Sequence, residues 1–104
     1  MTRDELFNIH KEMCAEALEL MKRKNADYAG GVADPFANFR RAEALGICTT
    51  EQAFLVRMTD KMSRLATYAQ RGDLKVSDET VHDTIVDMIN YSVLLAAFIR
   101  QKSK

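Results

Sequence analysis

The sequence lacks the long apolar segment of a membrane protein, the leader of a secreted protein and the net positive charge of a protein that binds long nucleic acids. Its longest apolar run, residues 93–99, is far too short to cross a bilayer, and no charged-then-apolar leader opens the chain. Fifteen basic and fifteen acidic residues cancel. A net charge of zero gives no overall attraction to a membrane or a long nucleic acid, so any anion must be bound by a local cluster.

Cysteine is also scarce. Cys14 and Cys48 lie far apart in the sequence and are not accompanied by paired histidines, which argues against a zinc site. We expect two free thiols in a reducing compartment, and therefore a cytoplasmic protein.

Length and patterning predict one helical domain over residues 1–104. The chain is 47% apolar, which is normal for a globular protein, but 104 residues bury only a small core, so we expect a homo-oligomer. Apolar residues recur at helical spacing and no segment alternates with a period of two. The predicted fold class is all-α, a small bundle of three longer helices and one short helix.

Capping signals give the predicted boundaries. Thr-x-x-Glu and Thr-x-x-Gln patterns open two of the helices, and Gly46 and Gly72 are placed to end two of them. Asp34 is expected to cap the short helix and Ser77 to cap the last one. The predicted helices cover residues 3–25, 35–45, 50–71 and 78 onward.

Two charged stripes follow at helical spacing. Arg57, Lys61 and Arg64 form a basic stripe, while Glu79, Asp83 and Asp87 form an acidic one. Such stripes on adjacent helices can hold a divalent metal and a phosphate together, or can simply form salt bridges with each other. We expect them to converge, across the seam between the last two long helices, on a pocket for a phosphate-rich molecule.

The acidic stripe is the candidate metal site. Glu79, Asp83 and Asp87 would supply the hard oxygen ligands that Mg²⁺ prefers, and Asp60 could add a further carboxylate. The alternative is structural: Glu79 complements the positive N-terminus of its helix, and Asp83 and Asp87 pair with cations on the neighbouring helix.

Ligand-binding candidates come from the basic stripe and from the loop around Gly30 and Gly31. Arginine grips phosphate oxygens bidentately and lysine binds them as a point charge. In the loop, asparagine can hydrogen-bond the edge of a base and tyrosine can stack on its face. The candidates are Lys24, Asn25, Asp27, Tyr28, Asn38, Arg57, Lys61 and Arg64.

The same residues carry a family resemblance over roughly residues 20–98. The chain resembles the small phage and prophage proteins called nucleotide modification associated domains. That family is more distantly similar to the all-α nucleoside triphosphate pyrophosphohydrolases of the MazG type. The resemblance rests on residues 24–28, 34–39, 57–65, 78–79 and 83–91.

The MazG-type resemblance implies a dimeric or larger enzyme that holds Mg²⁺ between carboxylates of two helices. Asp83 and Asp87 fall where such enzymes place their second acidic pair, although at a four-residue step instead of the usual Glu-x-x-Asp. The first motif, Glu-Glu-x-x-Glu, is reduced here to Asp60.

Three functions follow. The first is a Mg²⁺-dependent nucleotide pyrophosphohydrolase with Asp60, Asp83 and Asp87 as catalytic residues. The second is a non-catalytic anti-defence protein that sequesters a cyclic or ADP-ribose-type nucleotide, in the bacterial host cytoplasm if it is phage-encoded. The third is a purely structural helical oligomer.

Overall fold

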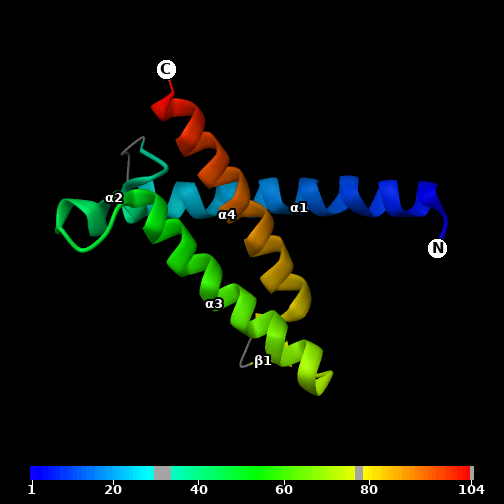
Figure 1. Cartoon of the computed structure of the whole chain (residues 1–104). Helices are drawn as coiled ribbons and strands as arrows, with labels where there is room; N and C mark the ends of the chain where they lie inside the picture. The colour runs from blue at the N-terminus through cyan, green and yellow to red at the C-terminus, as the bar shows by residue number, and fades with distance from the viewer. Residues whose placement is uncertain (30–33, 77–78, 104) are drawn as a thin grey trace.

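The computed structural model describes residues 1–29, 34–76 and 79–103, without the side chains of residues 26–29 and 75–76. These residues form four helices and one short strand pair (Figure 1). The all-α prediction is confirmed. The elements are α1 (Arg3–Ala29), α2 (Ala37–Ala44), α3 (Thr50–Arg71), β1 (Lys75–Val76), β2 (Glu79–Thr80) and α4 (Val81–Lys102).

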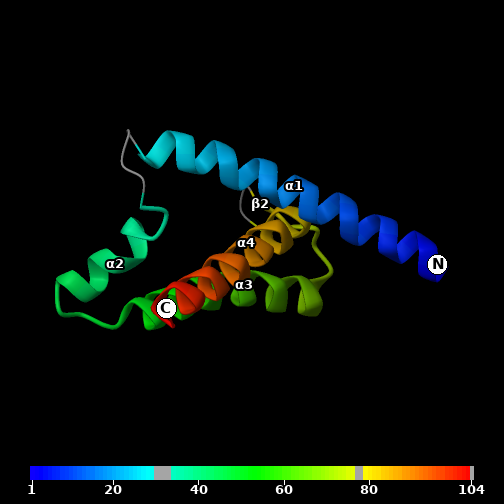
Figure 2. The ribbon, with the colours of Figure 1, turned by 90° about the horizontal axis from the view of Figure 1, so that it is seen from above.

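Helix α4 is the central element. It packs against α3 on one side and α1 on the other, and α2 packs on α3 (Figure 2). Helices α3 and α4 run in opposite directions (Figure 1), and the antiparallel β1–β2 pair lies between them in the chain. The C-terminal half of α1 crosses α4, while its N-terminal half projects beyond it (Figure 1). Among the described residues, no helix is long and apolar enough to cross a membrane.

The core is a cluster of aromatic rings at one end of the bundle. Phe36, Phe39, Phe54 and Phe98 are buried there, brought together from α2 and the turn before it, α3 and α4. Phe54 is fully buried and stacks on Phe39 with 3.9 Å between ring centroids. This cluster fixes the ends of three helices and leaves their other ends to be held by polar contacts.

The predicted capping patterns explain most helix ends. The Thr2 side chain accepts a 3.1 Å hydrogen bond from the Glu5 backbone N–H, and the Glu5 side chain accepts one of 3.1 Å from the Thr2 backbone N–H. Thr49 and Gln52 form the second capping box. Gly46 and Gly72 adopt left-handed conformations, with φ of 76° and 75°, and close α2 and α3.

Three boundaries differ from the prediction. Helix α1 continues four residues further, to Ala29. Helix α2 begins at Ala37, because Asp34 caps a turn by accepting a hydrogen bond from the backbone N–H of Phe36. The predicted cap Ser77 lies outside the described residues, and Thr80 is the residue that caps α4. The strand pair was not predicted, since two residues are too few to show an alternating pattern.

Candidate functional site

The two charged stripes meet at the seam between α3 and α4. The Lys61 ammonium lies 2.9 Å from Glu79 Oε1 and 2.9 Å from Asp87 Oδ2. The side chains of Lys61 and Asp87 are only 12% exposed. The expected convergence therefore occurs, but much of it is neutralisation between the stripes.

The ion pairs continue along the seam in both directions. Arg64 Nε lies 3.6 Å from Glu79 Oε2 and 3.3 Å from Asp60 Oδ2. The buried Thr84 hydroxyl donates a 2.5 Å hydrogen bond to Glu79. At the other end Lys24 of α1 lies 3.4 Å from Asp87 Oδ1. This ion-pair chain links α1, α3 and α4.

The ion pairs shift the pKa values of their members. Burial on its own would raise the pKa of Glu79, but hydrogen bonds from Thr84 and Lys61 outweigh it and lower that pKa. Burial opposes the charge of Lys61, but hydrogen bonds to Asp87 and Glu79 outweigh it and raise the pKa of Lys61. Both groups are therefore held in their charged forms.

The acidic residues do not gather around one point. Asp83 forms the capping box of α4 with Thr80, and Asp60 lies on an exposed part of α3 beside Arg64. Among the side chains that the structure describes, no three carboxylate, imidazole or thiol groups come close enough to hold a metal ion. Lys61 stands between the two enclosed carboxylates, Glu79 and Asp87, so this arrangement does not fit a Mg²⁺ site.

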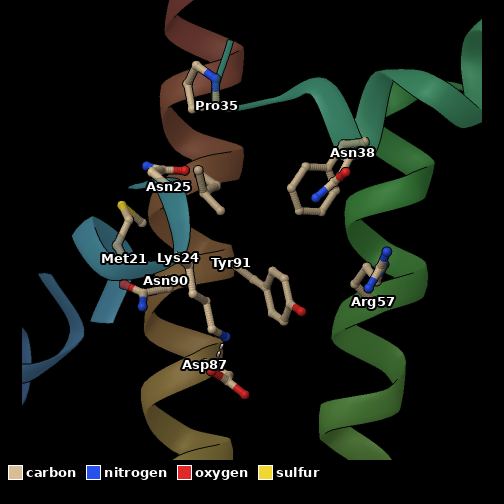
Figure 3. Close-up of a pocket in the computed structure, with 11 residues that line it drawn as sticks. Met21, Lys24, Asn25, Pro35, Asn38, Arg57, Asp87, Asn90 and Tyr91 are labelled. Carbon is tan, nitrogen blue, oxygen red and sulfur yellow. Dashed lines mark hydrogen bonds and ion pairs between the residues drawn. The ribbon is translucent and has the colours of Figure 1, made fainter. Parts of the chain in front are cut away.

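A cavity of about 270 Å³ opens beside the ion pairs, between the C-terminal part of α1, the start of α2 and the facing sides of α3 and α4 (Figure 3). Two cationic side chains line it, Lys24 from α1 and Arg57 from α3. Two amides, Asn25 and Asn38, add hydrogen-bonding groups. The other lining residues are Met21, Pro35, Phe39, Asp87, Asn90, Tyr91 and Leu94.

Arg57 differs from the other cations of the basic stripe. It makes no ion pair or hydrogen bond with the described residues, whereas Lys61 and Arg64 are both paired with Glu79. Its side chain is exposed and borders the cavity. A guanidinium in this position is available to a bound anion.

Tyr91 provides an aromatic wall that the sequence reasoning did not select. Its ring is half-buried, meets Phe39 edge-on at 6.2 Å, and in Figure 3 its hydroxyl points toward α3, where Arg57 lies. The signal was present, because Tyr91 follows Asp87 by four residues and so shares its helix face. Tyr28, the predicted stacking residue, and Asp27 have side chains outside the described residues.

Asn90 has a structural role beside the cavity. Its side-chain amide donates a 3.0 Å hydrogen bond to the backbone carbonyl of Ala17, which is buried at the crossing of α1 and α4. With Lys24–Asp87, this contact fixes α1 against α4 and so positions one wall of the cavity.

Residues 24–99 match the family described as nucleotide modification associated domain 1. The chain belongs to this family. The predicted resemblance is therefore confirmed at the level of the family name. No curated protein and no solved structure matches the chain significantly. In this member of the nucleotide modification associated domain family, the matched segment includes every residue that lines the cavity except Met21.

Proposed function

We propose that this protein binds a nucleotide in the cavity between α1, α3 and α4 and does not hydrolyse it. One observation carries the proposal: Lys24 and Arg57, from two different helices, border the same cavity as two amides and a tyrosine. A nucleotide needs cations for its phosphate and planar polar or aromatic groups for its base.

The charges around the cavity favour an anion. Lys24, Lys61 and Arg57 contribute three positive charges at this end of the seam, and Asp87 and Glu79 contribute two negative ones. The uncompensated charge belongs to Arg57. We place the phosphate between Arg57 and Lys24, the base edge at Asn25 and Asn38, and the base or sugar face at Tyr91.

The size of the cavity limits the ligand. A volume of about 270 Å³ lies just below the roughly 300–1,000 Å³ of pockets that enclose small molecules. We therefore infer that one nucleotide unit is enclosed and that any further unit of a cyclic or ADP-ribose-type ligand extends into solvent. This supports the sequestering function predicted from the sequence, acting in a bacterial cytoplasm.

Binding without turnover is favoured over hydrolysis by the position of Lys61. An ammonium between Glu79 and Asp87 neutralises the carboxylates that a hydrolase of the MazG type would use for its metal. The Mg²⁺-dependent pyrophosphohydrolase is therefore the competing outcome in the experiment below.

Calorimetry with AMP, ADP-ribose, cyclic di-AMP and adenosine, in EDTA, tests the proposal. We expect at least one phosphate-bearing compound to bind and adenosine to bind much more weakly. Arg57→Ala should weaken binding by about 10- to 100-fold, the effect of losing one charge-assisted hydrogen bond. Arg71→Ala removes an exposed arginine outside the cavity and is the matched control.

Chromatography of the bound compound separates the competing outcomes. Recovery of the intact nucleotide supports capture, while release of phosphate or pyrophosphate on adding Mg²⁺ would support the hydrolase. Absence of binding to all four compounds, together with an Arg57→Ala variant that changes only assembly, would favour the structural oligomer.

A further inference from the structure

The single chain exposes more surface than a folded monomer of its size. Its solvent-accessible surface is 7706 Å², whereas a monomer of 11.8 kDa is expected to expose about 5,900 Å². Its radius of gyration is 15.6 Å, compared with about 13 Å for a compact domain of this length. The chain is therefore more extended than a compact monomer of the same length.

One uncovered surface is the apolar side of α1. Ala17 is buried against α4, and Leu6 lies eleven residues before it, about three turns or 16 Å away on the same helix face. The face that packs on α4 therefore continues past the bundle with nothing in the described chain to cover it. Leu6, Phe7 and Leu18 are 53%, 58% and 51% exposed.

A second surface with large exposed side chains is the side of α4 that faces away from the aromatic core, where His82 also pairs with Glu16 of α1. Tyr91, Leu94 and Phe98 face the aromatic core, and Asn90 faces α1. Ile85, Val93 and Ile99 lie within about one third of the helix circumference, on the side opposite the core-facing residues, and are all exposed. Three large aliphatic side chains on one helix face are typical of an interface.

The two surfaces lie next to each other. Figure 1 shows α3 on one side of α4 and the N-terminal half of α1 projecting on the other side. In this view the projecting half of α1 and helix α4 diverge from their crossing point at an angle (Figure 1).

We propose that a second copy of this chain fills this angle in a two-fold symmetric dimer, with the N-terminal half of each α1 lying against α4 of the other protomer. In a two-fold arrangement, α1 of each protomer covers α4 of the other, so both apolar surfaces are covered on both chains. The surface exposed beyond that of a compact monomer is about 1,800 Å² per chain, or about 3,600 Å² for two chains. Permanent dimers bury roughly 2,000–5,000 Å² in total, so this area is enough for such a dimer. This inference is independent of the proposed ligand.

Analytical ultracentrifugation of the full chain tests the dimer. We expect the wild type to sediment at twice the chain mass of 11.8 kDa. Leu6→Asp and Val93→Asp should each raise the dimer dissociation constant by at least about tenfold, because each buries a charge in an apolar interface. Ile47→Asp is the control, since Ile47 is also an exposed aliphatic residue but lies in the loop before α3.

A thiol measurement locates the interface. Cys14 is exposed in the single chain and lies on the side of α1 that carries Phe7 and Leu18. In a Cys48→Ser background, Cys14 should react slowly with a thiol reagent in the dimer and quickly after Leu6→Asp. Circular dichroism of each variant checks that the helices remain folded.

Three results would overturn the inference. They are a wild-type monomer at 100 µM, a dimer that none of the α1 and α4 substitutions weakens, and a monomer that instead binds phospholipid vesicles through the same residues. Arg57→Ala should leave sedimentation unchanged, so failure of the dimer and failure of nucleotide binding are distinguishable.

Discussion

The Lys61 ammonium lies 2.9 Å from the Asp87 carboxylate, in the seam between α3 and α4. Asp87 also pairs with Lys24 of α1, whose Nζ lies 3.4 Å from Asp87 Oδ1. One carboxylate therefore positions two cations, one of which borders the cavity. This gives Asp87 a positioning role that does not require a metal.

Replacing Asp87 with asparagine should separate this positioning role from ligand binding. Asp87→Asn removes the charge partner of an enclosed ammonium, and we expect a loss of about 2 kcal/mol in the free energy of unfolding, measured by urea denaturation. Affinity for inorganic phosphate should rise, since a negative charge has left the cavity wall. A loss of phosphate binding with unchanged stability would contradict this interpretation.

Stability should depend on pH through the same ion pairs. The pKa of Glu79 is lowered from 4.5, so its contribution is present above about pH 4.5 and is lost as the pH falls through the lower value in the folded protein. The pKa of Lys61 is raised from 10.5, so its contribution is present below about pH 10.5 and is lost as the pH rises through the higher value.

Urea denaturation across the pH range measures this dependence. Glu79→Gln should lower stability at pH 7 and leave a smaller further loss between pH 5 and pH 3 than the wild type shows, a window of about two units around the ordinary carboxylate value. Equal acid sensitivity in both proteins would show that Glu79 does not contribute.

Asp83 is expected to matter for helix α4 and not for the ligand. Its carboxylate accepts a hydrogen bond from the Thr80 backbone N–H and faces the positive end of the helix. Asp83→Ala should cost about 0.5–1 kcal/mol of stability and leave nucleotide affinity unchanged. Asp83→Glu keeps the capping box and is the control. Unchanged stability with lost nucleotide binding in Asp83→Ala would place Asp83 in the site.

The aromatic core should be highly sensitive to truncation. Phe54 is fully buried among Phe36, Phe39 and Phe98, so Phe54→Ala should cost about 3–5 kcal/mol, a large part of the stability of a domain of this size. Val56→Ala, at an exposed position two residues on, should change stability by less than about 0.5 kcal/mol. Thermal or urea denaturation of both variants measures the difference.

Local patterns predicted the helices because capping and helical spacing are short-range properties. Thr2 with Glu5 and Thr49 with Gln52 form the expected boxes, and Gly46 and Gly72 end the helices as expected. The start of α4 was misplaced because Ser77 and Thr80 both resemble caps. Thr80 caps because β2 leads directly into α4 and places it beside Asp83.

The site was predicted in part. Lys24, Asn25, Asn38 and Arg57 were selected and all line one cavity. The spacing of Lys61 and Arg64 does not predict which carboxylates they pair with, because their partners depend on the register in which α3 packs against α4. That register brings Lys61 between Glu79 and Asp87 and turns two proposed functional stripes into an ion-pair chain.

The position of the aromatic core has a consequence for how the molecule opens. The four phenylalanines join α2, α3 and α4, while α1 is attached by Ala17, the Asn90 amide and the Lys24–Asp87 and Glu16–His82 pairs. In an isolated protomer, amide hydrogens of α1 should therefore exchange with deuterium sooner than those of α3 around Phe54. Detachment of α1 would remove Lys24 and Asn25 from the cavity before the rest of the chain unfolds.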